Sequence, residues 1–496
     1  MSTTAPSLKK NYLYNAFLTV TNLVIPVFSF SYIAPLFRPE VYGRVSFAQS
    51  TVNYFLLMAS AGLPLYGARE VARVRNDSRE KSLLVSELLL ITCATTICSL
   101  LLYLVTIYLV PAMRASAPLF RVYALLLVVN LFNIDWFFHG EERYRNIALR
   151  SSICRIVSLA SLFFFVREQD HFIRFAVLSV ATVGAINLSG VLTARQALIF
   201  SLRALRPMRH IRPILILFGS AVTASVYVYL DTVMLGILSD EIHVGLYAAA
   251  VRISRIAVML VLSLGAVALP RITYYLNDKQ HVAHRELAGK SYHFLLFCAL
   301  PTTIFMVTFS RQLLAVLTRN TFLDAAPALV ISSLLVSVMA VSNFVGIQVL
   351  FPAGKEKGIL YSTAAAAVIN IALNLILIPR YHHNGAAVAT LAAEAAAMVF
   401  LIVLARRHLP VALVSWRVAG YLVAALISGL CACGVVLITT NPVLVLTGGG
   451  AAYVLVYGTI LLLYRDPTVI DALRTAIRFP GLRIMQKDAA GTTNAD

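Results

Sequence analysis

Charged side chains are scarce in this sequence. Of its 496 residues, 13% are charged and 59% are hydrophobic. The mean hydropathy is +0.82. A water-soluble domain of this length needs far more polar surface to stay dispersed. The composition therefore excludes a soluble globular protein and indicates a chain that lies largely in lipid.

Motifs for catalysis and nucleotide binding are also lacking. The sequence contains no Walker A motif, no glycine-rich phosphate loop and no H-E-x-x-H motif. We therefore expect neither ATP-driven pumping nor zinc-protease chemistry, and we predict no catalytic residue, no metal site and no cofactor. His382 and His383 stand beside a predicted turn, but the histidines lack the spacing of metal ligands.

Cysteines are few, and each lies inside an apolar run, where it resembles a small hydrophobic residue more than part of a disulfide framework or metal site. The six are Cys93, Cys98, Cys154, Cys298, Cys431 and Cys433. The net charge of +19 comes with no compact basic domain and no nucleic-acid motif, so no nucleic-acid partner is expected. The N-terminus shows no cleavable signal, and we expect its first helix to be retained.

Apolar runs of about 20 residues recur along the whole chain, and each is long enough to cross a hydrocarbon core. Lipid offers no partners for the backbone, so these runs must be helices or closed barrel strands. They are continuous rather than alternating, which favours helices. The predicted spans are 11–36, 42–65, 84–110, 118–138, 151–167, 171–194, 213–238, 243–269, 291–310, 325–350, 359–379, 385–405, 417–440 and 443–464. The fold class is thus an all-α membrane protein with about fourteen transmembrane helices.

Basic residues fall in every second loop between these spans. The basic loops follow the second, fourth, sixth, eighth, tenth and twelfth helices, as in 69–81, 143–150, 195–212, 271–290, 355–357 and 406–407. Positively charged loops stay on the cytoplasmic side of a membrane. We therefore expect both termini to be cytoplasmic. The opposite loops are short, and no soluble domain is inserted.

Two segments repeat the same pattern six helices apart. Residues 137–143 (FFHGEER) and 351–357 (FPAGKEK) each place a glycine, a charged residue, a glutamate and a basic residue between two apolar helices. This predicts two six-helix lobes related by an axis along the membrane normal, with a cavity at their interface. The expected parts are the lobes 1–210 and 211–408, the added helices 13 and 14 in 409–464, and a cytoplasmic tail, 465–496.

A charge deep in the bilayer is costly and usually serves function or finds a partner. Arg252 and Arg255 lie roughly 14 and 18 Å into the eighth predicted helix and share one face. Asp231 lies at a depth comparable with Arg252 on the preceding antiparallel helix. We predict an Asp231–Arg252 pair, which leaves Arg255 for an anionic ligand. A purely structural ion-pair network is the alternative.

Other polar residues are placed less deeply or admit two roles. Glu87, Asp135 and Arg155 lie near cytoplasmic helix ends, where interfacial anchoring competes with function, and Arg44 lies near an outer end. Glu394 is mid-helix and could carry a proton, since desolvation favours its neutral form. It could instead form a packing contact with Asn370 and Asn374, which share a helix face.

Several segments resemble the Wzx-type polysaccharide flippases. They are GRVSFAQS at 43–50, Gly62, GARE at 67–70, DWFFHGEE at 135–142, DTVMLG at 231–236, VGLYAAA at 244–250, NIALNLILIP at 370–379, NGAA at 384–387 and Glu394. His139 stands where glutamine is usual in that family. The resemblance covers the chain from about 40 to 400. It implies the multidrug/oligosaccharidyl-lipid/polysaccharide exporter fold, with two lobes around an alternating-access cavity.

The resemblance also implies a flippase, not an enzyme, that exports undecaprenyl-diphosphate-linked oligosaccharide units across the bacterial inner membrane for O-antigen, capsule or exopolysaccharide. Expected partners are that lipid-linked substrate, membrane lipids, and polysaccharide polymerase and ligase machinery. The expected substrate contacts are Arg252, Arg255, Arg44, Asn370, Asn374 and Trp136. The expected coupling groups or structural ion pairs are Asp231, Glu394, Asp135 and Glu87.

Cations at depth suit a diphosphate and acidic sugars. Coupling to a proton, a sodium ion or the membrane potential is left open. Three other functions remain as alternatives. A multidrug or cation antiporter would favour an aromatic, acidic cavity, and a peptidoglycan-precursor flippase would share the fold. A membrane glycosyl polymerase or ligase would need a large outward catalytic loop, for which the loops here look too short.

Overall fold

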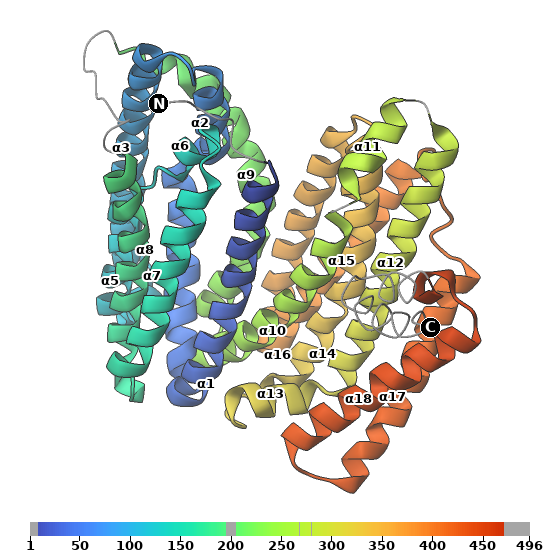
Figure 1. The fold of residues 1–496 in the computed structure, drawn as a ribbon. Coiled ribbons are helices and arrows are strands. Elements are labelled where there is room, and N and C mark those ends of the chain that lie inside the picture. The colour runs from blue at the N-terminus through green and yellow to red at the C-terminus, as the bar shows by residue number, and fades with distance from the viewer. Residues whose placement is uncertain (1–7, 195–204, 267, 279, 471–496) are drawn as a thin grey trace, which may run out of the picture. The chain divides into compact units, whose positions relative to one another are not determined.

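The computed structural model describes residues 8–194, 205–266, 268–278 and 280–470 (Figure 1). Every regular element in these ranges is helical. Eleven helices are long and apolar enough to cross a membrane among the described residues, which confirms an all-α, multi-pass membrane protein. The count of fourteen spans stays a prediction.

The first ten elements are α1 (Leu8–Ser60), α2 (Leu63–Arg73), α3 (Ser78–Leu109), α4 (Pro111–Ala115), α5 (Ala117–Asn130), α6 (Asp135–Gly140), α7 (Tyr144–Phe165), the 3-10 turn η1 (Gln169–His171), α8 (Phe172–Ala194) and α9 (Met208–Leu238). The next are α10 (Glu241–Ala266), α11 (Leu269–Asn277), α12 (His281–Thr308), α13 (Ser310–Thr318), η2 (Leu323–Ala325), α14 (Ala326–Ser333), α15 (Leu335–Asn343), the π-helix η3 (Phe344–Leu350), α16 (Glu356–Ala405), α17 (Trp416–Ile438) and α18 (Pro442–Leu463).

Two of the long helices are interrupted where the sequence predicts a turn between spans. Arg38 breaks α1 with φ 55° and ψ 167°. His382 breaks α16 with φ 49° and ψ −127°. Residues other than glycine rarely adopt such positive φ values. Each of these helices therefore carries two predicted spans joined at a sharp break, namely 11–36 with 42–65 and 359–379 with 385–405.

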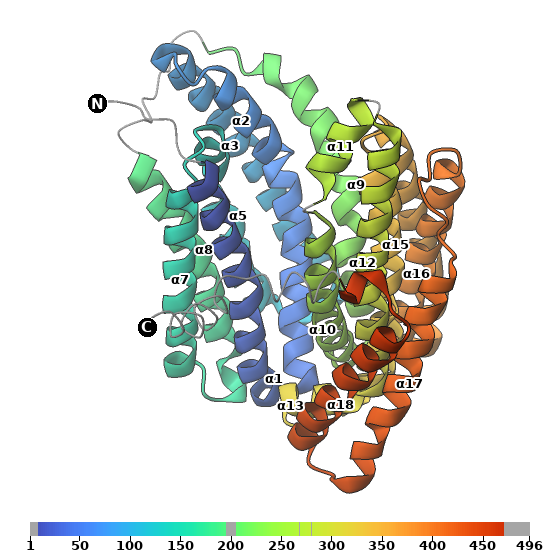
Figure 2. The ribbon, with the colours of Figure 1, turned by 45° about the vertical axis from the view of Figure 1, so that its right-hand side comes forward.

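Packing divides the chain into two compact units. One comprises 1–251, 317–328 and 363–393, and the other comprises 252–316, 329–362 and 394–496. The predicted lobes 1–210 and 211–408 rest on the repeat in the sequence and not on packing, and they stay a prediction. The added helices α17 and α18 run side by side in the second unit, where α17 also packs on α12 (Figure 2). Residues 471–496 of the expected tail, and the basic residues Arg195 and Arg203, lie outside the described residues.

Within the first unit, α1 packs against α3, α5, α7 and α9. A buried hydrophobic cluster forms where α2 meets α6, and it includes Val71, Trp136 and Phe137. The helices approach closely there because glycine faces each contact. A Cβ on Gly140 would lie 2.6 Å from the Cβ of Val71, and one on Gly67 would lie 2.7 Å from the indole of Trp136.

This close approach predicts that Gly140→Ala destabilises the protein. The added methyl group would push against Val71 and the Ala68 carbonyl, so we expect a loss of about 1–3 kcal/mol, typical of overpacking. Unfolding in detergent micelles measures it. Gly434→Ala in α17 is the matched control, because a Cβ there has no atom within 4 Å. Equal stability of the two variants would contradict the packing account.

Candidate functional site

Asp231 is buried among three helices of the first unit, with 2% of the residue exposed. Its Oδ1 accepts hydrogen bonds from the amide groups of Asn370 at 2.9 Å and Asn374 at 2.6 Å. Its Oδ2 accepts from the hydroxyls of Tyr247 at 2.6 Å and Thr390 at 2.5 Å. The carboxylate on α9 is thus held by α10 and by both arms of α16. We call these five residues the Asp231 cluster.

The donor set determines what the Asp231 cluster can do. A buried carboxylate needs several donors or a cation to offset its desolvation. The Asn374 amide donates to Asp231 and, at 3.1 Å, to the Asn370 oxygen, while its own Oδ1 is buried without a hydrogen-bond partner in the described chain. Rotation of that amide would turn this oxygen toward the carboxylate. Carboxylate, amide and hydroxyl oxygens together suit a proton or a small hard cation such as sodium.

The Asp231 cluster joins three residues that the sequence singles out. Asp231, Asn370 and Asn374 lie together, while Tyr247 and Thr390 were missed. Thr390 lies four residues before Glu394 on α16 and so shares its face, a signal that could have found it. Glu394 itself is buried, with 8% exposed. The predicted Asp231–Arg252 pair and the roles of Arg252, Arg255 and Glu394 stay predictions.

Arg44 lies where α1 meets the start of α10. Its guanidinium pairs with Glu241 and with Glu40. Two glycines let the backbones touch here, because a Cβ on Gly43 would overlap the Glu241 carbonyl and one on Gly245 would overlap the Pro39 carbonyl. The predicted second and eighth helices are therefore clamped together at this end, with Arg44 forming part of the clamp.

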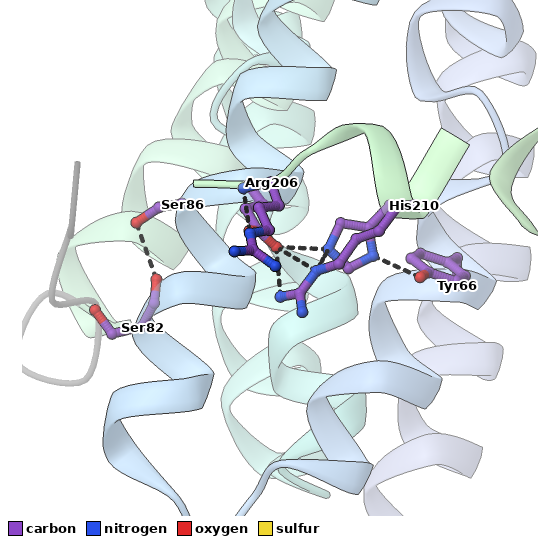
Figure 3. A network of polar contacts seen from close by, with 7 residues as sticks. Tyr66, Ser82, Ser86, Arg206 and His210 are labelled. Atoms are coloured by element: carbon purple, nitrogen blue, oxygen red, sulfur yellow. Dashed lines mark hydrogen bonds and ion pairs between the residues drawn. The ribbon is translucent and has the colours of Figure 1, made fainter. Parts of the chain in front are cut away.

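Glu87 on α3 belongs to a network that joins α2 and α3 to the start of α9, and Figure 3 labels Tyr66, Arg206 and His210 of this network. Its carboxylate accepts from the Arg206 backbone at 2.6 Å, from Arg209 at 2.7 Å and from His210 at 2.7 Å. The other ring nitrogen of His210 contacts the Tyr66 hydroxyl at 2.6 Å. A pocket of about 300 Å³ lies beside it, and its lining includes Arg209 and His210.

The 135–142 segment has its own ion pair. Asp135 pairs with Arg150, whose guanidinium also donates to the Ile186 carbonyl at 2.6 Å and lies 5.0 Å from the ring centre of Phe138. Trp136 is buried, and its indole N–H donates to the Asn133 carbonyl at 3.2 Å. The expected substrate contact of Trp136 stays a prediction.

Among the described residues, no group of three or more His, Cys, Asp or Glu side chains could hold a metal ion. The six cysteines, all within the described ranges, are free thiols.

Comparison with solved structures identifies the fold. The fold is similar to that of a lipid II flippase in an inward closed conformation, with a TM-score of 0.73, 15% identity, and 92% of this chain and 99% of that chain covered. It is also similar to an inward-facing multidrug-resistance MATE transporter of the MOP superfamily, with a TM-score of 0.64, 13% identity, and 79% and 94% covered. The chain has the fold of this exporter superfamily.

Comparison with sequence families is more specific. The family model for polysaccharide biosynthesis proteins matches residues 8–276, and the MatE family model matches 217–376. The chain belongs to the polysaccharide biosynthesis protein family. A putative O-antigen transporter of Escherichia coli K12 is 25% identical over 82% of this chain and 99% of its own length. A probable low-salt glycan biosynthesis flippase of Haloferax volcanii is 24% identical over 34% of this chain and 36% of its own length.

The relatives and structural neighbours named here are transporters and flippases, not enzymes. The match to the polysaccharide biosynthesis protein family confirms the expected family.

The Glu87 network predicts a large loss of stability for Glu87→Ala. Removing the carboxylate leaves the buried His210 ring and the backbone N–H of Arg206 without their acceptor, which we expect to cost about 3 kcal/mol. Unfolding in detergent measures the loss. Glu286→Ala is the control, because Glu286 forms a helix-surface pair with Lys290 at 2.8 Å and should leave stability unchanged. A Glu87→Ala protein as stable as this control would contradict the structural role of the network.

Proposed function

We propose that the protein is a flippase for lipid-linked oligosaccharide. It moves repeat units on an undecaprenyl-diphosphate carrier from the inner to the outer face of the bacterial cytoplasmic membrane, for surface polysaccharide synthesis. Membership of the polysaccharide biosynthesis family and the similarity to an O-antigen transporter support this substrate class. The alternation of basic loops supports cytoplasmic termini. Polymerase and ligase machinery outside the membrane would receive the product.

The substrate sets two physical requirements. Its diphosphate and sugars must avoid hydrocarbon, while its polyprenyl tail stays in lipid, so the path needs a polar cavity with a lateral opening. The diphosphate also needs cations at depth. Arg252 and Arg255 are three residues apart on α10 and supply guanidinium groups on one face.

Transport across the membrane proceeds by alternating access in this proposal. The clamp between α1 and α10 supports it, because these helices belong to different predicted lobes and their contact needs no side chain at Gly43 or Gly245. The backbone contact is joined by the Arg44–Glu241 ion pair, which can break and re-form as the helices separate and meet again.

Coupling is assigned to the Asp231 cluster. This assignment rests on the enclosed carboxylate of Asp231 on α9, whose four donors lie on α10 and α16, since the lobes would move these helices. A proton or sodium ion bound there would neutralise the carboxylate, release its donors and change how α10 and α16 pack against α9. The transported ion is cargo that the cluster binds and releases once per cycle.

Asp231→Asn should abolish the response of transport to an ion gradient. The amide cannot take up a proton or balance a cation, so flipping in proteoliposomes would no longer accelerate when a proton or sodium gradient is imposed. Fluorescently labelled undecaprenyl-diphosphate oligosaccharide reports the rate, and separate proton and sodium gradients identify the ion. Asp170→Asn, at an exposed residue, is the matched control. A variant that keeps the wild-type gradient response would refute coupling at Asp231.

Arg255→Ala should weaken substrate binding. Loss of one charge-assisted hydrogen bond to the diphosphate predicts a KM about tenfold higher. Arg255→Lys, which keeps the charge, should recover part of it, and Arg311→Ala at an exposed arginine should not change KM. The same assay with lipid II in place of the oligosaccharide tests the peptidoglycan-precursor alternative. An unchanged KM for Arg255→Ala would remove Arg255 from the substrate site.

A further inference from the structure

Three histidine rings meet where the α9–α10 junction faces the break in α16. The ring of His243 stacks on that of His382 with centroids 4.1 Å apart and planes 14° apart. It also stacks on His383 at 5.2 Å and 24°. His382 is exposed, His243 is partly buried and His383 is buried. We call these residues the histidine stack.

Polar neighbours hold the three rings in place, and ring nitrogens remain that can bind protons. A ring nitrogen of His243 contacts the Asp240 carboxylate at 2.7 Å, and one of His382 contacts the Ser239 hydroxyl at 2.9 Å. His383 contacts the Asp324 carbonyl at 3.3 Å. Its Nδ1 is buried with no hydrogen-bond partner in the described chain.

A metal does not explain this arrangement. The nitrogens of an imidazole bind a metal in the plane of the ring, and near-parallel stacked rings do not direct those lone pairs to a common point. The described residues accordingly contain no group suited to a metal ion. The proton is the ligand that three adjacent imidazoles can take up, because an unperturbed histidine titrates near pH 6.5.

The histidine stack lies on α10 and α16, two of the three helices that form the Asp231 cluster. Ser239 and Asp240 follow Leu238, the last residue of α9, and His243 lies one turn before Tyr247 on α10. His382 follows Asn374 by eight residues on α16, roughly 12 Å along a helix. His382 also has φ 49°, a backbone conformation that costs free energy in a non-glycine residue.

We propose that the histidine stack is a proton-binding site on the outer side, where the end of α9 and the start of α10 meet the break in α16. Its protonation releases the break in α16 from the α9–α10 junction. The outer location rests on the proposed orientation. The site itself is independent of the substrate and of coupling at Asp231.

The electrostatics give the direction of the effect. Neutral rings can stack, and each keeps its polar contact. A proton on His243 would lie beside the Asp240 carboxylate, whereas protons on two rings would set like charges within stacking distance. Asp240 contacts His243 and Asp324 contacts His383, whereas His382 contacts the uncharged hydroxyl of Ser239. Acid therefore separates the rings and lets strained His382 relax.

Hydrogen exchange of the full-length protein in nanodiscs tests the proposal. Amide protection factors of 239–247 and 380–386, corrected for intrinsic rates, should fall about tenfold between pH 7.5 and 5.5, the range in which histidines titrate. His382→Gln and His243→Gln should remove this fall while keeping the protection seen at pH 7.5. His171→Gln, at a histidine in the η1 turn on the same predicted side, should keep the wild-type fall.

Two results would overturn the proposal. One is wild-type protection in these segments that is independent of pH, which needs no variant to fold. The other is an acid-induced fall that persists in both glutamine variants. Because this readout involves neither substrate nor ion gradient, it can fail while the flippase function stands, and the reverse is also true.

Discussion

A carboxylate inside a bundle surrounded by lipid must find its donors within the protein, and Asp231 finds four of them. They come from two amide groups and two hydroxyls on α10 and α16. Removing the negative charge leaves these donors competing for a weaker acceptor, and moving any one helix breaks a bond that water cannot replace. The packing of three helices thus depends on the charge state of one side chain.

The contacts around Asp231 share one register. Asp231 meets Asn370 and Asn374 at separations of 139 and 143 residues, and Ser239 meets His382 and Tyr247 meets Thr390 at 143. A constant offset means that α9 and α10 run parallel to the two arms of α16 without slipping. The α9–α10 junction therefore lies opposite the break at His382 in α16. A shift of these helices at one of the contacts must also move the other contacts.

Much of the fold follows from the sequence because hydropathy is a one-dimensional signal. Most residues of the predicted spans that the structure describes are helical, and the breaks at Arg38 and His382 fall where turns were predicted. The predicted span 118–138 is an exception, because residues 131–134 separate α5 from α6. The resemblance at 231–236 and 370–379 marked the right segments. It did not reveal that Asp231 and Asn374 bond, because a contact across 143 residues leaves no local pattern.

Histidines illustrate the same limit. His210 appears in the sequence as an isolated loop residue, yet it joins Glu87 to Tyr66. His243 attracts no attention beside the His382–His383 pair until the register places them together. Single polar residues on helices carry meaning through their partners, and a partner on another helix is visible only in three dimensions.

The first two turns of α10 connect the clamp to the Asp231 cluster through helix geometry alone. Glu241 and Gly245, four residues apart, face α1, where they meet Arg44 and Pro39. His243 and Tyr247, also four apart, face α16 and Asp231. Residues two positions apart on a helix, such as Glu241 and His243, point to nearly opposite sides. One short rigid segment therefore carries both contacts. In the proposed transport cycle, a rotation of this segment that opens the clamp would also move the Tyr247 donor of Asp231, and a change of charge at Asp231 would act on the clamp in return.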